Sequence, residues 1–257
     1  MIPFEDCTTL SLLFHLNSEP WMNTGAYEQS TYSVEYRELL AAEEALNLPP
    51  PAPTPLLRLM KTRSSCRQYQ RRAMPLETLS SLLGGACGLT RFTEVSPHVK
   101  AFFRAAPSAG GLFPLETYLT TQDVEGVPDG LYHYAVRNHS LELIKGGSLF
   151  EERHGSLLAD PFVQDANLVV FLTAVFMRTQ RKYGPRGYRY VLLEAGHVAQ
   201  NLCLLAAEQG LGSLCIGGFV DSKLNRFLKL DGVREAAVYA VGVGHGNLPG
   251  SEVPGRT

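Results

Sequence analysis

The sequence comprises 257 residues, of which 45% are hydrophobic and 19% are charged, and its formal net charge is -2. A chain of this length and composition can bury a substantial core, as one large domain or two small ones, and extensive disorder is excluded. Because the charges nearly balance, no global field attracts nucleic acid or an anionic membrane, and neither is expected as a partner.

The five cysteines are scattered along the chain, without a C-x-x-C pair and without a histidine at metal-ligand spacing. This pattern predicts reduced thiols in a cytoplasmic protein, no metal site, and inert side chains for Cys203 and Cys215 in their apolar surroundings. Glu5 and Asp6 stand where a signal peptide would carry basic residues. The longest apolar run, Leu168 to Met177, is too short to span a bilayer.

Residues 1–48 predict a helical lead-in, with an apolar stretch over 10–16 and a helical pattern over 36–46. Five prolines within residues 49–55 then predict a polyproline-like spacer and the boundary of the main domain, 56–257. We expect the lead-in either to pack on that domain or to complete a subunit interface.

In the main domain, hydrophobic periodicity and turn residues predict helices over 56–62, from Pro75 to about 88, and over 190–209. Strands are predicted over 115–121, 131–135, 141–144, 167–176, 214–219 and 237–243. This is an α+β pattern with a mixed, largely antiparallel sheet flanked by helices. No Walker A or Rossmann glycine motif follows a predicted strand.

A basic and hydroxylic segment, Arg63-Ser64-Ser65-Cys66-Arg67, follows the first of these helices. Guanidinium forks bind phosphate oxygens in pairs, and serine hydroxyls suit a phosphate or a polyol. The alternative is a helix cap with solvated arginines.

Two runs of small residues would let the backbone approach a flat ligand closely, because little or no side chain intervenes. The first is Pro107-Ser108-Ala109-Gly110-Gly111, and the second contains Gly217 and Gly218. Ordinary tight loops are the alternative for both runs.

A basic and aromatic stretch over residues 181–190 precedes the longest predicted helix. The Gly184-Pro185 pair predicts a loop, from which Lys182 and Tyr183 can converge on a ligand. A solvated basic turn is the alternative. On the helix that follows, Glu194 and His197 are spaced like a metal pair, but without further ligands core hydrogen bonding is favoured.

Together and in this order, these motifs resemble the nitroreductase-like FMN superfamily, and within it the azoline oxidases, which convert thiazolines and oxazolines in peptides into thiazoles and oxazoles. The resemblance covers roughly residues 56–246. It is carried by R-S-S-x-R-x-Y at 63–69, P-S-A-G-G at 107–111, K-Y-G-x-R-G-Y-R at 182–189, L-E-A-G-H-x-x-Q-N at 193–201 and G-L-G at 210–212.

The resemblance implies a nitroreductase-like fold and a homodimer with FMN at the subunit interface. The R-S-S-x-R segment would hold the phosphate and ribityl chain, the small-residue loop would lie along the isoalloxazine, and the glycine pair would face the flavin N5 region. These cofactor-binding positions are Arg63, Ser64, Ser65, Arg67, Ser108, Ala109, Gly110, Gly111, Gly217 and Gly218. His245 and Asn247 stand where the family has a basic residue near the phosphate, so that contact is left open.

The resemblance also implies catalytic roles for Lys182 and Tyr183. Oxidising an azoline removes one hydrogen as a proton from the α-carbon and one as a hydride to the flavin, so a base is needed. Lys182 fits this role if a dry pocket or the neighbouring arginines lower its pKa, with Tyr183 orienting it or sharing the proton.

The expected activity is therefore an FMN-dependent dehydrogenation of an azoline in a nonribosomal or ribosomal peptide, with dioxygen reoxidising the flavin. We expect the peptide to be presented by a synthetase or carrier protein. Two alternatives stay open: an NAD(P)H-dependent reductase of nitroaromatics or quinones from the same superfamily, and a non-catalytic flavoprotein subunit.

Overall fold

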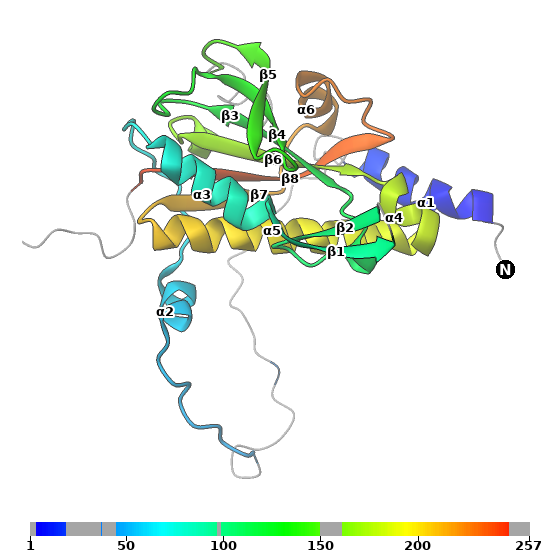
Figure 1. The fold of residues 1–257 in the computed structure, drawn as a ribbon, viewed down its shortest axis with the longest axis horizontal. Coiled ribbons are helices and arrows are strands. Elements are labelled where there is room, and N and C mark those ends of the chain that lie inside the picture. The colour runs from blue at the N-terminus through cyan, green and yellow to red at the C-terminus, as the bar shows by residue number, and fades with distance from the viewer. Residues whose placement is uncertain (1–3, 19–36, 38–44, 97–98, 150–160, 247–257) are drawn as a thin grey trace, which may run out of the picture.

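The computed structural model describes residues 4–18, 37, 45–96, 99–149 and 161–246 (Figure 1). Helix α1, Phe4–Asn17, occupies the start of the lead-in. The helix expected over 36–46 lies almost entirely outside the described residues. Residues 46–54 have no regular secondary structure and are exposed, as the run of prolines predicts.

Six antiparallel strands form the central sheet, in the order β5-β4-β3-β6-β8-β7. The largely antiparallel sheet expected from the sequence is thus confirmed. Within the described ranges, parallel pairing is confined to isolated bridges such as Ser65 with Ser213. The strands are β3 Leu115–Thr121, β4 Gly130–Ala135, β5 Ser140–Gly146, β6 Leu168–Val175, β7 Gly212–Ile216 and β8 Glu235–Gly244.

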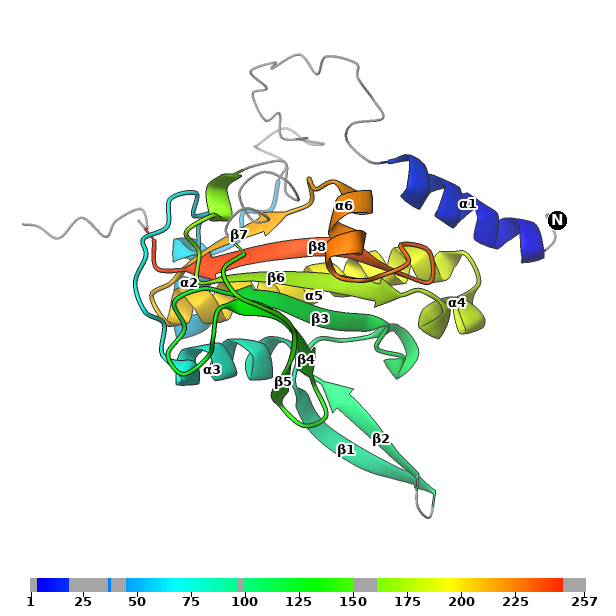
Figure 2. The same ribbon diagram turned by 90° about the horizontal axis from the view of Figure 1, so that it is seen from above.

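The sheet is covered on both faces, which explains why its central strand β6 is apolar at every position except Thr173. Alternate β6 side chains enter two separate hydrophobic cores, Val170 and Leu172 on one face and Val169 and Phe171 on the other. Helices α3, Leu76–Cys87, and α5, Arg186–Glu208, cover the first face, while the short α6, Asp221–Phe227, covers the second (Figures 1 and 2).

Before the central sheet, the structure differs from the sequence prediction in the start of helix α3 and in an additional hairpin. Helix α2, Pro55–Thr62, agrees with the prediction, but Pro75 is the N-cap of α3 and not its first residue, since its ψ of 144° is extended. A hairpin of β1, Leu89–Ser96, and β2, Val99–Arg104, was not predicted and projects from the body (Figure 2). Every β1 residue is exposed, so the strand lacks the buried face that produces a period-2 signal.

The predicted loop carrying Lys182 and Tyr183 is instead the last turn of a helix. Helix α4, Met177–Tyr183, ends at Gly184, whose φ of 57° lies in the left-handed region, and α5 starts at once with Arg186. The Gly184-Pro185 pair therefore breaks the helical path for two residues only, because proline is tolerated at a helix start.

Candidate functional site

The small-residue loop and the Lys182-Tyr183 pair meet directly at Gly110. This glycine has a φ of 65°, and a Cβ built on it would lie 2.7 Å from the Tyr183 hydroxyl and 2.8 Å from Lys182 Nζ. Two side chains from the end of α4 thus lie against a backbone position that has room for no side chain of its own. The next residue, Gly111, also has a φ of 65°, but a Cβ there would meet nothing within 4 Å.

Aromatic packing helps to hold the Lys182-Tyr183 pair in place. The Tyr183 and Tyr190 rings meet edge to face, with centroids 5.0 Å apart, so the end of α4 is braced against the first turns of α5. Lys182 Nζ lies 5.3 Å from the centroid of the Tyr183 ring. The two polar ends are therefore neighbours on one surface, although adjacent helical residues point about 100° apart.

The loop at Gly110 is anchored from beneath by Ser108 and Glu194. The Ser108 hydroxyl oxygen accepts from the Phe113 amide at 2.9 Å, and Ser108 also hydrogen-bonds to the Glu194 carboxyl group. Glu194 is only 3% exposed, and burial raises its pKa to about 7 despite the opposing effects of Ser108 and Arg104. The sequence favoured core hydrogen bonding for both Glu194 and His197. Glu194 is buried and bonded to Ser108, although its Oε2 has no partner among the described residues, whereas His197 is exposed, so the prediction is wrong for His197.

A second group of predicted residues lies along the edge strand β7. Arg63 caps α2, its amide donating to the Leu59 carbonyl at 2.8 Å, and the chain after it pairs with β7 through the Cys66 amide and the Ser213 carbonyl at 2.9 Å. Gly217 is exposed just beyond β7, where a Cβ would be in ordinary contact with the Tyr239 ring at 3.9 Å. The fold thus brings the Arg63 segment and the Gly217 turn to one strand.

The β7 group contains features that suit a phosphorylated, polyol-bearing cofactor. The Ser64 hydroxyl oxygen is buried and has no hydrogen-bond partner among the described residues, and an orphaned buried hydroxyl calls for a partner. Arg63 is adjacent to Ser64 in the chain and carries a guanidinium, and Gly217 presents no side chain beside the strand. The residues present therefore fit the phosphate and ribityl parts of FMN.

The other residues that were considered as FMN contacts have fewer features that suit a cofactor. Arg67 is exposed, with its guanidinium 5.9 Å from the centroid of the Phe162 ring. Gly218 is half-buried beside Gly217. The His245 ring is hydrogen-bonded to the Ala73 carbonyl at 3.2 Å, and Asn247 lies outside the described residues.

The prediction that Cys203 and Cys215 are inert needs correction. Their sulfur atoms are 3.5 Å apart, between α5 and β7, and Cys215 is exposed. Hydrogen bonds from Cys203 and Tyr239 lower the pKa of Cys215 to about 6, with a further contribution from the Arg63 cation. The apolar neighbours in the sequence hid these polar groups, which arrive from other elements.

Helix α5 separates the two groups of site residues. Tyr190, which packs on Tyr183, and Cys203, which contacts Cys215, are separated by about 20 Å of helical rise. Helix α4 lies at one end of α5, and β7 lies alongside its other half (Figures 1 and 2). Within one chain, the Lys182-Tyr183-Gly110 group and the Arg63-Gly217 group therefore form two separate clusters.

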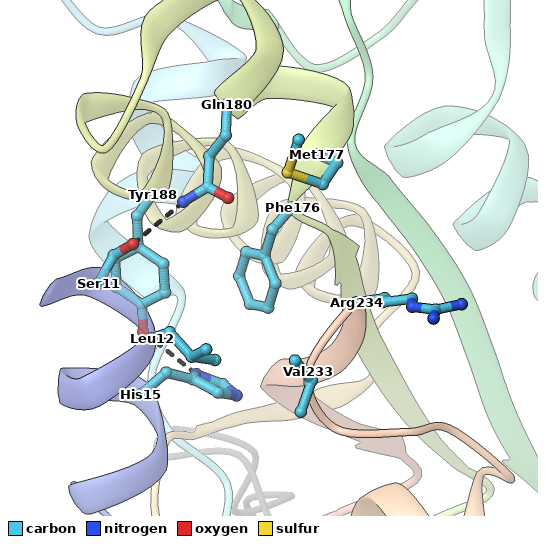
Figure 3. Close-up of a pocket in the computed structure, with 9 residues that line it drawn as sticks. All are labelled: Ser11, Leu12, His15, Phe176, Met177, Gln180, Tyr188, Val233 and Arg234. Atoms are coloured by element: carbon cyan, nitrogen blue, oxygen red, sulfur yellow. Dashed lines mark hydrogen bonds between the residues drawn. The ribbon is translucent and has the colours of Figure 1, made fainter. Parts of the chain in front are cut away.

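The opposite side of α4 borders a different cavity, of about 230 Å³, between α1 and the main body (Figure 3). The Gln180 amide donates to the Ser11 hydroxyl at 3.1 Å, and His15 Nδ1 is 3.2 Å from the Tyr188 hydroxyl. Burial lowers the pKa of His15. These contacts show how the lead-in helix packs on the body, and the mostly apolar lining is completed by Leu12, Phe176, Met177, Val233 and Arg234.

Neither a metal cluster nor a separate membrane anchor stands out in the described part of the chain. No group of three or more His, Cys, Asp or Glu side chains among those residues could hold a metal ion. By length and composition, α5 could cross a membrane, but it packs with α3 on the sheet core, as a core helix does.

The sequence matches the nitroreductase family over residues 60–245. MJ1384 from Methanocaldococcus jannaschii, which bears a nitroreductase name, is 38% identical over 168 residues, covering 65% of this chain and 81% of that protein. McbC from Escherichia coli, the microcin B17-processing protein, is 31% identical over 146 residues, 53% of this chain and 52% of McbC. This chain thus matches about half the length of McbC.

Among solved structures, the E. coli microcin synthetase McbBCD complex, with truncated pro-MccB17 bound, contains a chain of the same fold. Its TM-score is 0.70 at 21% identity, with 95% of this chain and 94% of that chain covered. The shared architecture therefore extends beyond the part of the sequence that matches the family.

Proposed function

The chain belongs to the nitroreductase family of FMN-binding oxidoreductases, and from this premise we propose that it dehydrogenates azoline rings. The substrate would be a thiazoline or oxazoline in a peptide, and the product the corresponding azole. The observation that carries the proposal is the convergence of Lys182 Nζ and the Tyr183 hydroxyl on Gly110. A similarity to the microcin B17-processing protein McbC supports a peptide substrate.

In this proposal the chain's own residues handle the proton. Lys182 takes the proton from the acidified α-carbon of the ring, and Tyr183 holds the Lys182 amine or shares the proton. Gly110 keeps the space between them free of a side chain, and Ser108 with Glu194 fixes the loop beneath. FMN, when bound, would supply the acceptor for the second hydrogen as a hydride, and dioxygen would be the final oxidant.

The separation of the two clusters bears on how the cofactor would be held. Arg63, Ser64, Ser65 and Arg67 would bind the phosphate and ribityl chain, and Gly217 with Gly218 would lie beside the ring. Because the Gly110 cluster lies about 20 Å along α5 from this group, we propose that a second copy of the chain supplies it in a homodimer. A synthetase or carrier protein would present the peptide, in the cytoplasm.

A reductase of nitroaromatics or quinones is the second candidate, because MJ1384 bears a nitroreductase name and is 38% identical over 81% of its length. Such an enzyme would oxidise NAD(P)H and would not require a base at position 182. The two candidates therefore differ in what Lys182 must do.

The deciding experiment compares the wild-type protein with Lys182→Ala and Lys182→Arg, each loaded with FMN. On a thiazoline-containing peptide, the wild type should form azole with a mass loss of about 2 Da, and both variants should lose about 10²–10⁴-fold in rate. Flavin content should not change. Rapid NAD(P)H oxidation in all three proteins, without azole from any thiazoline or oxazoline peptide, would exclude the dehydrogenase and favour the reductase.

A further inference from the structure

Cys203 and Cys215 form a close pair of thiols that the dehydrogenation does not use. Cys203 lies on the buried face of α5, and Cys215 is exposed on β7, with the two sulfur atoms 3.5 Å apart. A disulfide requires a separation of about 2.05 Å. The two sulfur atoms would therefore have to approach by roughly an ångström and a half for the bond to form.

The surroundings give the two thiols different chemical characters. Cys215 shares a hydrogen bond with Cys203, in which either thiol can donate, and it also hydrogen-bonds to the Tyr239 hydroxyl. The positive charge of Arg63 favours a negative charge on the Cys215 sulfur. These contacts hold the pKa of Cys215 at about 6, whereas the hydrogen bond to Cys215 and burial raise the pKa of Cys203. Because Cys215 is exposed and Cys203 is buried, Cys215 is the thiol that a dissolved oxidant can reach, and its lowered pKa favours the nucleophilic thiolate there.

We propose that Cys203 and Cys215 are a peroxide-oxidised dithiol, in which Cys215 is the attacking sulfur and Cys203 the resolving one. The Cys215 thiolate displaces hydroxide from hydrogen peroxide and becomes a sulfenic acid, and the hydroxide takes up a proton to leave as water. Cys203 then attacks the sulfenic sulfur, the S–O bond breaks, and the sulfenic hydroxyl leaves as a second water after taking up the Cys203 proton. Two sulfurs lose one electron each, and one peroxide is reduced to two waters.

The position of the two cysteines makes their oxidation depend on whether FMN is bound, an inference that rests on the proposed function. Arg63, whose charge acts on Cys215, and Gly217, two residues after Cys215, are both proposed FMN contacts, so we expect bound FMN to cover the exposed sulfur. Cofactor-free protein is then the form that peroxide oxidises. Since disulfide formation draws the Cys215 sulfur towards α5, it also changes the surface on which the cofactor would rest.

The test exposes the purified protein, FMN-loaded and stripped of FMN, to equimolar hydrogen peroxide and follows thiol titre, intact mass and disulfide-linked peptides. The stripped protein should lose two thiols and about 2 Da, and a single linkage should join Cys203 to Cys215. Cys203→Ser should accumulate a sulfenic acid on Cys215 that dimedone traps, and Cys215→Ser should resist oxidation. FMN loading should slow the reaction at least tenfold.

Cys87 provides the internal control, because it is buried and burial raises its pKa to about 11. Oxidation of Cys87 at the same rate as Cys215, or no Cys203–Cys215 linkage at a dose that consumes other thiols, would overturn the proposal. Equal rates with and without bound FMN would overturn only the covering of Cys215 by the cofactor. That outcome is distinct from a failure of azole formation, which is measured separately on the peptide substrate.

Discussion

The Gly110 cluster and the β7 cluster differ in how complete they are within a single chain. At Gly110 the side chains already meet, with the Tyr183 hydroxyl and Lys182 Nζ against the loop and Ser108 fixed from below. At β7 polar groups are left open, since the Ser64 hydroxyl has no partner among the described residues and Cys215 is exposed. The contrast indicates that the proposed proton-handling groups are preorganised by the fold, whereas the proposed phosphate-binding surface has polar groups that a ligand could satisfy.

The largest effect should come from filling the space at Gly110. Gly110→Ala would place a methyl group within 3 Å of both Tyr183 and Lys182, displacing them, and we expect azole formation to fall by about 10²-fold. Gly111→Ala, assayed at saturating FMN because Gly111 is itself an expected cofactor contact, is the matched control, since it imposes the same left-handed strain where nothing lies within 4 Å. Initial rates on a thiazoline peptide measure both. Equal losses in the two variants would show that backbone strain, and not the meeting of side chains, sets the rate.

The next effect concerns the anchor under the same loop. Because burial raises the pKa of Glu194 to about 7 from an ordinary value of 4.5, its contribution to stability is fully present below pH 4.5 and is lost as pH rises through 7. The loss amounts to about 3 kcal/mol at pH 8. Glu194→Gln does not titrate, so its urea midpoint should change less than that of the wild type between pH 5 and pH 8. Parallel pH profiles for the two proteins would contradict this assignment.

Arg63 tests the β7 cluster without touching Lys182 or Tyr183. Removing its charge in Arg63→Ala should weaken FMN binding by about 10–100-fold, the value of a charged hydrogen bond. Fluorescence titration of FMN measures the affinity, and azole formation should recover at saturating FMN. Arg58→Ala removes an exposed charge from the neighbouring helix α2 and should leave the affinity unchanged. A turnover defect that excess FMN does not restore would place Arg63 with the proton-handling groups.

The smallest effect is expected from removing a buried hydroxyl that has no hydrogen-bond partner, in comparison with one that has a partner. Since the Ser64 hydroxyl is buried without a partner, Ser64→Ala should leave the stability of FMN-free protein unchanged or raise it by up to about 1 kcal/mol, while FMN affinity falls several-fold. Ser80→Ala is the contrasting variant, because its hydroxyl is hydrogen-bonded to His139 at 2.8 Å. Denaturant titration and FMN titration measure the two quantities. A destabilised Ser64→Ala protein would show that its hydroxyl is already satisfied.

Much of the architecture followed from local patterns. The bounds of β3 agree with the predicted strand over 115–121, and the β4–β5 hairpin was expected on the basis of its turn residues. Lys182 and Tyr183 were expected to converge from a loop, but they lie in the last turn of helix α4. The loop was predicted because glycine and proline usually end regular structure. The exposed hairpin β1–β2 was missed, since a strand with no buried face shows no alternation.

The features missed at the site share one physical reason. Ser108 and Glu194 are far apart in the sequence, as are Arg63 and Cys215, and each pair interacts only because different elements pack on one helix or strand. Side-chain hydrogen bonding and burial determine both the raised pKa of Glu194 and the lowered pKa of Cys215. Neither pKa shift can be read from the neighbouring residues in the sequence, on which the prediction of inert cysteines was based.

The sequence by itself determined which residue types are available: the arginine and serines for a phosphate, the small residues for a flat ring, and a lysine beside a tyrosine. The tertiary structure decided which of them meet. It brings Lys182 and Tyr183 onto Gly110, and it separates them from Arg63 by about 20 Å of α5. Spacing along a chain fixes neighbours within a helix or strand, but contacts between elements depend on how their buried faces pack.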